Sequence, residues 1–380
     1  MTRRGERLLA VVTVLGSFAL CLAAAEAVLR FLPVATGMRT VSVTAASPVS
    51  HFSPNRDFVF SRDWNLALVN RGHVNNAGFV NDQDYHQESP LVAIVGDSYI
   101  EAAMVPFGET MHGRLAAALE GRLRVYSFGA AGAPLSQYLV WARHAVNEYG
   151  AGALVINVVG NDFDESLAAY GRKPGFWQYV PDETRALRLR LSEYQRGVAS
   201  EVVTASALGR YLVFNLQVGP QLFALRSLAL GSPAAAPEYA GNTAVAAEVA
   251  RVKDSLMAID AFFRDLAGLV RLPPERVLLT MDGFRYPQAA DKGAGSYFDR
   301  MRRAFRAKAE ALGYEIIDLD PAFFERHRQT AEKFEYPMDG HWNATGHQVA
   351  FEAVMASRLI KSLAHSVEQG TGGKVRPRVE

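Results

Sequence analysis

Five short apolar runs alternate with longer segments of helical periodicity from Leu91 onwards, and this alternation limits the possible folds more than any other feature. The apolar runs predict strands at residues 91–95, 123–128, 153–159, 276–281 and 314–319. The periodic segments predict helices at about 108–120, 135–149, 244–269, 296–312 and 345–364. Strands that alternate with helices in this way form a parallel sheet covered on both faces. The sequence therefore predicts one large, doubly wound α/β domain.

Polar and small residues follow the first three predicted strands. Ser98 lies in Gly96-Asp97-Ser98-Tyr99 directly after the first strand, Gly132 ends a run of small residues after the second, and Asn161 follows the third. Ligands of open parallel sheets bind beyond the carboxyl ends of the strands, so we expect these three residues at one edge. A serine held there beside free backbone N–H groups suits acyl transfer.

Asp339 and His341 stand two positions apart near the C-terminus, just before a helical stretch. In an extended segment, side chains at i and i+2 share a face, so the Asp339 carboxylate is expected to accept from one ring nitrogen of His341. The other ring nitrogen is then free to act as a base.

Together these four segments resemble the SGNH family of hydrolases and acyltransferases, also called GDSL, whose Ser, Gly, Asn and His fall here at Ser98, Gly132, Asn161 and His341. The resemblance implies a three-layer α/β/α, flavodoxin-like sandwich. It also implies that Ser98 is the nucleophile, His341 the general base and Asp339 its orienting acid. The oxyanion hole would consist of the Ser98 N–H, the Gly132 N–H and the Asn161 side chain.

One departure from the family pattern concerns the acid. The commoner arrangement is Asp-x-x-His, whereas Met338 stands three positions before His341 and Asp339 stands two before it. The Asp-x-His-Trp form resembles membrane-associated polysaccharide O-acetyltransferases of the same superfamily. This departure leaves the geometry of the acid open.

Four aromatic residues are candidates for substrate binding, each with a structural alternative. Trp342, beside the base, can line an acyl or sugar pocket or serve as a core anchor. Residues 164–243 are predicted to form an insertion that acts as a lid or substrate wall, with a helical stretch at 208–228 and an Ala/Pro-rich loop at 231–237. Its aromatics Phe176, Trp177 and Tyr179 can stack on a sugar ring or cover an acyl chain, or they can simply fix the insertion to the core.

The N-terminus combines arginines at positions 3, 4 and 7 with 18 mainly apolar residues from Leu8 to Ala25. That length fits a spanning helix or a cleavable signal. The helical pattern continues through Arg30, which favours an uncleaved anchor. The positive-inside rule then places the rest of the chain outside the cytoplasm. We expect an anchor at 1–34, a linker and packed loops at 35–90, the main domain at 91–365 and a disordered tail at 366–380.

The composition excludes some functions. Lys plus Arg number 40 against 39 Asp plus Glu, which argues against a surface that binds nucleic acid through its phosphates. The single cysteine, Cys21, lies within the apolar N-terminal segment, so the remainder has no disulfide. No metal or organic cofactor is implied.

The function expected from the sequence is a membrane-anchored serine esterase acting on O-acyl esters of a small molecule or glycan, with acetyl as the expected acyl group. A cell-envelope polysaccharide O-acetyltransferase would use the same triad, and the two differ only in whether water or a sugar hydroxyl accepts the acyl group. Two rivals remain: a lipase-like activity on long acyl chains, and a non-catalytic glycan-binding or assembly protein. The second rival would be marked by a missing Ser, Asn or His, and none is missing.

Overall fold

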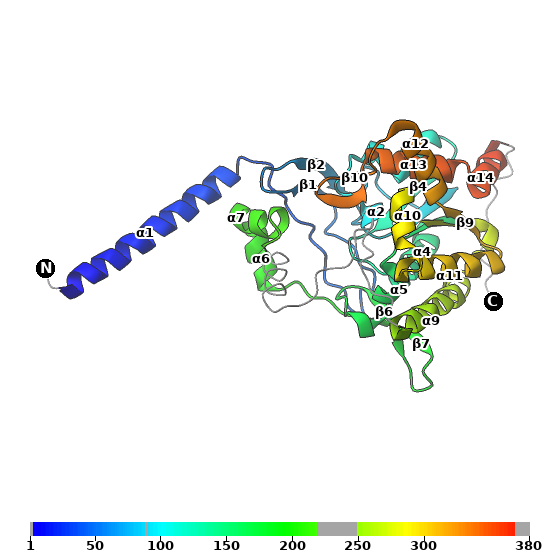
Figure 1. Cartoon of the computed structure of the whole chain (residues 1–380), viewed down its shortest axis with the longest axis horizontal. Coiled ribbons are helices and arrows are strands. Elements are labelled where there is room, and N and C mark those ends of the chain that lie inside the picture. Colours follow the sequence, from blue (N-terminus) through cyan, green and yellow to red (C-terminus); the bar gives the residue numbers. More distant parts are fainter. Residues whose placement is uncertain (1–2, 88–89, 219–248, 369–380) are drawn as a thin grey trace. The chain divides into compact units, whose positions relative to one another are not determined.

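The computed structural model describes residues 3–87, 90–218 and 249–368 (Figure 1). The chain divides into two compact units. Unit 1 comprises residues 1–38, 57–71 and 196–234, and unit 2 comprises residues 39–56, 72–195 and 235–380. Each unit is therefore assembled from segments far apart in the sequence. The predicted loop at 231–237, part of the helical stretch at 208–228 and most of the predicted tail lie outside the described residues.

A five-stranded parallel sheet forms the centre of unit 2, as the alternating pattern predicted. The sheet order is β4-β3-β5-β8-β9, or 2-1-3-4-5 when these five strands are numbered along the chain. This is the flavodoxin-like order, whose ligand crevice lies between the first and third strands. The crevice is therefore expected beyond the carboxyl ends of β3 and β5. The five strands are β3 (Leu91–Gly96), β4 (Arg124–Gly129), β5 (Ala153–Val158), β8 (Val277–Met281) and β9 (Glu315–Asp318).

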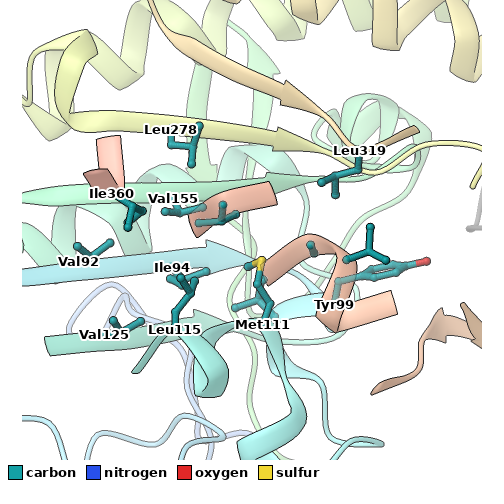
Figure 2. Packing of buried hydrophobic residues seen from close by; sticks show 14 of the residues in the cluster. Val92, Ile94, Tyr99, Met111, Leu115, Val125, Val155, Leu278, Leu319 and Ile360 are labelled. Carbon is teal, nitrogen blue, oxygen red and sulfur yellow. The ribbon is translucent and has the colours of Figure 1, made fainter. Parts of the chain in front are cut away.

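Alternate residues of the strands point to opposite faces of the sheet. On one face, Val92 and Ile94 of β3 pack with Leu115 of α3 and Ile360 of α14, as Figure 2 shows. Trp342 lies in the same buried cluster. On the other side of the sheet, α4 contacts β3, β4 and β5, and α9 packs on both α4 and α11. The helices that cover the first face are α3 (Met111–Ala118), α12 (Asp320–Thr330), α13 (Ala344–Met355) and α14 (Arg358–Glu368), and the second group is α4 (Leu135–Tyr149), α9 (Val249–Asp265) and α11 (Tyr297–Ala311).

The predicted helix 135–149 matches α4, whereas two other predicted helices differ from their predictions. Residues 345–364 were expected to form one helix, but α13 ends at Met355 and α14 begins at Arg358. Ser357, buried between them, accepts a hydrogen bond from the Ile360 N–H at the start of α14. The predicted helix at 108–120 begins only at Met111, because Thr110 caps it by accepting from the Gly113 N–H.

Short elements connect the main ones. Two small antiparallel sheets are formed by β6 (Trp177–Pro181) with β7 (Leu187–Leu191), and by β10 (Glu335–Tyr336) with β11 (Asp339–Trp342). The described part of the predicted insertion therefore contains a β-hairpin. The remaining short elements of unit 2 are α2 (Ser98–Glu101), α5 (Asp162–Glu165), α10 (Pro287–Gly293), three 3₁₀ turns at Phe107–Glu109, Ala168–Tyr170 and Pro274–Arg276, and a π-helical turn at Leu266–Val270.

Unit 1 contains the long N-terminal helix α1 (Arg3–Leu29), which is long and apolar enough to cross a membrane, with a mean hydropathy of 2.4 over its best window. Leu29 and Val34 are buried against Ala207, with Leu208 and Tyr211 packed around them. The other described elements of this unit are α6 (Val198–Ala205), α7 (Ala207–Arg210) and a π-helical turn at Tyr211–Asn215. The paired strands β1 (Arg56–Arg62) and β2 (Leu68–Val74) belong mainly to this unit.

Candidate active site

Ser98 begins the short helix α2, two residues beyond the end of β3. Its preceding residue, Asp97, caps α2 by accepting a hydrogen bond from the Tyr99 N–H at 3.0 Å. The turn lies directly against the end of β4, where a Cβ on Gly129 would stand 2.8 Å from the Glu101 nitrogen and 2.9 Å from the Asp97 oxygen. Only glycine fits at that position. Ser98 is largely buried at the sheet edge and keeps 7% of its surface exposed.

His341 contacts Ser98 directly. Its Nε2 lies 2.7 Å from the Ser98 Oγ, and its Nδ1 is in hydrogen-bond contact with the Asp339 carboxylate. The same Asp339 oxygen accepts from the His341 N–H at 3.0 Å, which fixes the acid and the imidazole on one short strand, β11. The structure therefore brings the three predicted residues together, and the spacing of two residues between acid and histidine allows the contact that the sequence left open.

The backbone N–H groups of Ser98 and Gly132 have no acceptor among the described residues. Gly132 has a φ of +76°, a left-handed conformation that favours glycine. The atom nearest to a Cβ built on Gly132 is the Lys173 Nζ, at 3.8 Å. Gly132 therefore faces open space bounded by an ammonium group.

Asn161 lies beyond the end of β5, at the N-cap position of α5, and its side chain makes no capping hydrogen bond there. Its side-chain Nδ2 donates to the Glu165 carboxylate at 2.9 Å, and the same carboxylate oxygen pairs with the Lys173 Nζ at 2.8 Å. Because a carboxylate can only accept, this contact assigns the NH₂ group of the amide to the Glu165 side. An amide NH₂ carries two hydrogens, so one remains to be donated elsewhere.

Arg285, which follows β8, is completely buried and holds the His341 segment in place. Its guanidinium donates to the Gly340 carbonyl at 2.8 Å and pairs with Asp282 at 2.6 Å. It also donates to the hydroxyl of Tyr99, which in turn donates to the same Gly340 carbonyl at 3.2 Å. One cation therefore connects the residue after Ser98 to the residue between Asp339 and His341.

Two buried carboxyl groups lie beside the triad. Burial raises the pKa of Asp97 to about 6 and that of Glu101 to about 7, while the nearby imidazole of His341 lowers both in part. Glu101 accepts a hydrogen bond from the Ala131 N–H, next to Gly132. Its carboxyl group therefore links α2 to the loop that carries the second candidate oxyanion donor.

Two of the aromatic residues predicted to bind substrate are core residues instead. Trp342 is 0% exposed, and its indole N–H donates to Asp282 at 3.1 Å. Tyr179 is 1% exposed, and its hydroxyl donates to Asp265. A side chain without accessible surface cannot stack on a substrate, so the prediction was wrong for these two and the core alternative holds.

Phe176 and Trp177 are half-buried. Phe176 contacts Trp141 edge to face, with ring centroids 6.1 Å apart, and the Trp177 indole N–H donates to the Pro48 carbonyl at 2.9 Å. Trp177 also lines a pocket with Leu139 and Arg143 of α4, and the lining of this pocket includes no residue of the triad.

Other polar residues near the strand ends have structural contacts. Asp162 is buried and accepts from the Tyr138 hydroxyl and the Val159 N–H, both at 2.8 Å. His347 is buried, and its Nδ1 accepts from the Met111 N–H at 3.1 Å. Among the residues that the structure describes, no group of three His, Cys, Asp or Glu side chains could hold a metal ion.

Sequence reasoning missed Arg285, Glu101 and the Glu165–Lys173 pair. Asp282-Gly283-Phe284-Arg285 follows the fourth strand, so the rule that located Ser98 and Asn161 would also have indicated this segment. The position of Lys173 depends on how residues 164–178 fold back, and no local signal encodes that.

No protein-family model matches the sequence, and no curated protein matches it. Among solved structures, the chain is similar to LAE5, an α/β hydrolase from the metagenome of Lake Arreo, Spain, with 14% identity and a TM-score of 0.39 over 76% of this chain and 99% of that one. It is also similar to a putative acylhydrolase from Bacteroides fragilis, with 11% identity and a TM-score of 0.36 over 74% and 91% of the two chains. A carbohydrate acetylesterase family member from Sinorhizobium meliloti has 12% identity and a TM-score of 0.36 over 72% and 99%. Because all three TM-scores lie below 0.5, the fold is assigned from the strand order of the central sheet. The candidate site is assigned from the hydrogen bonds among its own residues.

Proposed function

We propose that this chain is a serine esterase of the SGNH type, which cleaves O-acyl esters through an acyl intermediate on Ser98. The observation that carries the proposal is the continuous contact from the Ser98 Oγ through the His341 ring to Asp339. A serine hydroxyl is a weak nucleophile at neutral pH, and a base in contact with it is what acyl transfer requires.

In the proposed reaction the Ser98 Oγ attacks the ester carbonyl while its proton passes to the His341 Nε2. Asp339 accepts from the Nδ1–H and stabilises the imidazolium that forms. The imidazolium then returns the proton to the departing alkoxide, and the acyl group stays on Ser98. A water molecule, deprotonated by the same imidazole, releases the acid.

The negative charge on the carbonyl oxygen requires donors that are already in place. The Ser98 N–H and the Gly132 N–H are without acceptors among the described residues, and Asn161 has a second amide hydrogen to offer. We assign these three groups to the oxyanion. Each such donor contributes roughly 3–4 kcal/mol to stabilisation of the transition state.

A polysaccharide O-acetyltransferase is the second candidate, because Asp339-Gly340-His341-Trp342 has the Asp-x-His-Trp form that resembles membrane-associated O-acetyltransferases, and here the acid contacts the histidine at this spacing. In transfer, a sugar hydroxyl in place of water attacks the acyl-serine. Transfer is rejected if an acceptor glycan gains no acyl groups while a donor ester is consumed.

We further propose that the chain acts outside the cytoplasm, anchored by α1. The apolar helix with arginines at its N-terminal end supports this orientation through the positive-inside rule. An O-acetyl ester of a cell-envelope glycan is then an accessible substrate. Among the predicted aromatics, Phe176 and Trp177 keep exposed surface and remain candidates for contact with it.

Cleavage of p-nitrophenyl acetate by the full chain in detergent tests the proposal, with Ser98→Ala and His341→Ala in parallel. We expect both variants to lose activity to background. If the native chain releases nitrophenol from this ester, and acetate from acetylated xylan, no faster than the Ser98→Ala variant does, the esterase proposal fails. A non-catalytic glycan-binding protein then becomes the better description.

A further inference from the structure

Unit 1 exposes several large apolar side chains close to the C-terminal end of α1. Phe31 is 90% exposed, Trp64 69%, and Val198 and Val202 of α6 are 79% and 64% exposed. Val198 and Val202 are four residues apart, so they lie on one face of α6. Exposed apolar groups that gather in one small unit mark an interaction surface.

Glu26, near the C-terminal end of α1, connects this helix to α7 through hydrogen bonds. This carboxylate accepts hydrogen bonds from the Ser206 hydroxyl at 2.8 Å, the Ala207 N–H at 3.0 Å and the Leu208 N–H at 2.7 Å. Leu29, three residues further along the chain, is buried in one apolar cluster with Ala207. The first turn of α7 is therefore held at the level of Glu26 on α1.

The position of Glu26 sets the depth of this contact. The apolar stretch of α1 ends at Ala25, one residue before Glu26. At 1.5 Å per residue, the stretch from Leu8 spans about 27 Å, close to the thickness of the hydrocarbon core of a bilayer. If α1 crosses a membrane, Glu26 and the first turn of α7 lie where hydrocarbon gives way to headgroups.

The exposed apolar residues are connected to the Glu26 level by short links. Ser206, which donates to Glu26, is also the C-cap of α6, so α6 leads directly to the boundary. Trp64 is linked to the α1–α7 contact, because the Tyr211 hydroxyl donates to the Trp64 carbonyl at 2.6 Å and Tyr211 packs against the cluster of Leu29 and Ala207. Tryptophan is enriched at membrane interfaces, where its ring has one apolar and one polar side.

We propose that α6, Phe31 and Trp64 form a lipid-contacting collar around the exit of α1, seated in the headgroup layer of the bilayer. The partner is the lipid surface and not another protein, because α1 itself brings the collar to that surface. The collar holds unit 1 against the membrane in addition to the single helix. This proposal rests on the membrane anchoring by α1 proposed above and does not depend on the esterase chemistry.

Site-specific labelling tests the collar in the full chain. In a Cys21→Ser background, three variants each receive one cysteine: Val202→Cys in the collar, Leu15→Cys within α1, and Leu312→Cys in unit 2. Leu312 is an exposed aliphatic residue outside unit 1, at 44% exposure, and serves as the matched control. Each cysteine is labelled with an environment-sensitive fluorophore, and the protein is placed in phosphatidylcholine nanodiscs.

Brominated phosphatidylcholine should quench the fluorophores at positions 15 and 202 but not the one at position 312. Aqueous iodide should strongly quench only the fluorophore at position 312. The collar is rejected if the Val202 label responds like the Leu312 label while the Leu15 label is quenched by the brominated lipid. It is equally rejected if the brominated lipid quenches none of the three, since α1 then does not enter the bilayer. Protection of the Val202 label from iodide without quenching by the brominated lipid would assign this surface to a protein partner instead.

Discussion

The Arg285 guanidinium donates a hydrogen bond to the Gly340 carbonyl at 2.8 Å, and Gly340 is the one residue between Asp339 and His341. Arg285 also pairs with the buried Asp282, whose other oxygen accepts from the Trp342 indole. The buried Arg285–Asp282 ion pair, which follows β8, therefore holds the segment that carries the acid and base of the proposed triad.

Replacing Arg285 with methionine should destabilise the protein by about 3–5 kcal/mol, because Asp282 would remain buried without its cation. The free energy of unfolding in urea measures this loss. The matched control is Arg300→Met on the exposed side of α11, where we expect a change within about 0.5 kcal/mol. Equal stabilities for the two variants would show that the Arg285 network does not support the site.

Asn161→Ala should lower kcat for ester cleavage by about 10²–10³, because one donor to the oxyanion is lost. Stability should change little, since the Asn161 Oδ1 has no hydrogen-bond partner among the described residues and its only side-chain bond is the one to Glu165. Steady-state kinetics of the variant, beside Asn147→Ala on the exposed surface of α4, make the measurement. A kcat equal to that of the control would remove Asn161 from the oxyanion hole.

Glu165 acts in this account as a positioning residue that orients the Asn161 amide. Glu165→Ala should reduce kcat between about tenfold and a hundredfold with little change in KM, because a displaced donor weakens transition-state binding selectively. Glu165→Gln keeps an acceptor for the amide and should recover most of the rate. In the double variant with Asn161→Ala, the Glu165 effect should disappear, and full additivity of the two losses would contradict the assigned role.

The buried carboxyl of Glu101 should make the free energy of unfolding depend on pH. Burial raises its pKa from 4.5 to about 7, so the folded protein holds this proton more tightly than the unfolded chain does. The difference in pKa therefore favours the folded state fully below pH 4.5, where the Glu101 carboxyl is protonated in both states. This stabilisation is lost as the pH rises through about 7. The loss amounts to roughly 3 kcal/mol.

Urea unfolding between pH 4.5 and pH 8 checks the effect of Glu101. Relative to Glu101→Gln, the native protein should lose stability across this window and then level off. Glu120→Gln, at an exposed position, should follow the native curve. Parallel curves for the native chain and Glu101→Gln would mean that this carboxyl does not titrate as described.

The sheet was predictable because β3, β5 and β8 are short, mainly apolar and fully buried runs that alternate with segments of helical periodicity, as is typical of a parallel sheet covered on both faces. The ends of the first three predicted strands in the sequence then indicate Ser98, Gly132 and Asn161 as candidate site residues. The stacking role given to Trp342 was wrong because the sequence does not reveal which side of β11 faces the core. The Glu165–Lys173 pair and the assembly of unit 1 from three chain segments depend on long-range packing, which local patterns do not encode.

Covalent labelling of the nucleophile tests the central claim most directly. The full chain in detergent is treated with diethyl p-nitrophenyl phosphate, and the modified peptide is located by mass spectrometry. The account predicts one diethylphosphoryl group on Ser98, formed rapidly in the native chain and lost in His341→Ala. No modification, modification of a different serine, or equal labelling of Ser98 without His341 would contradict an activated serine at this site.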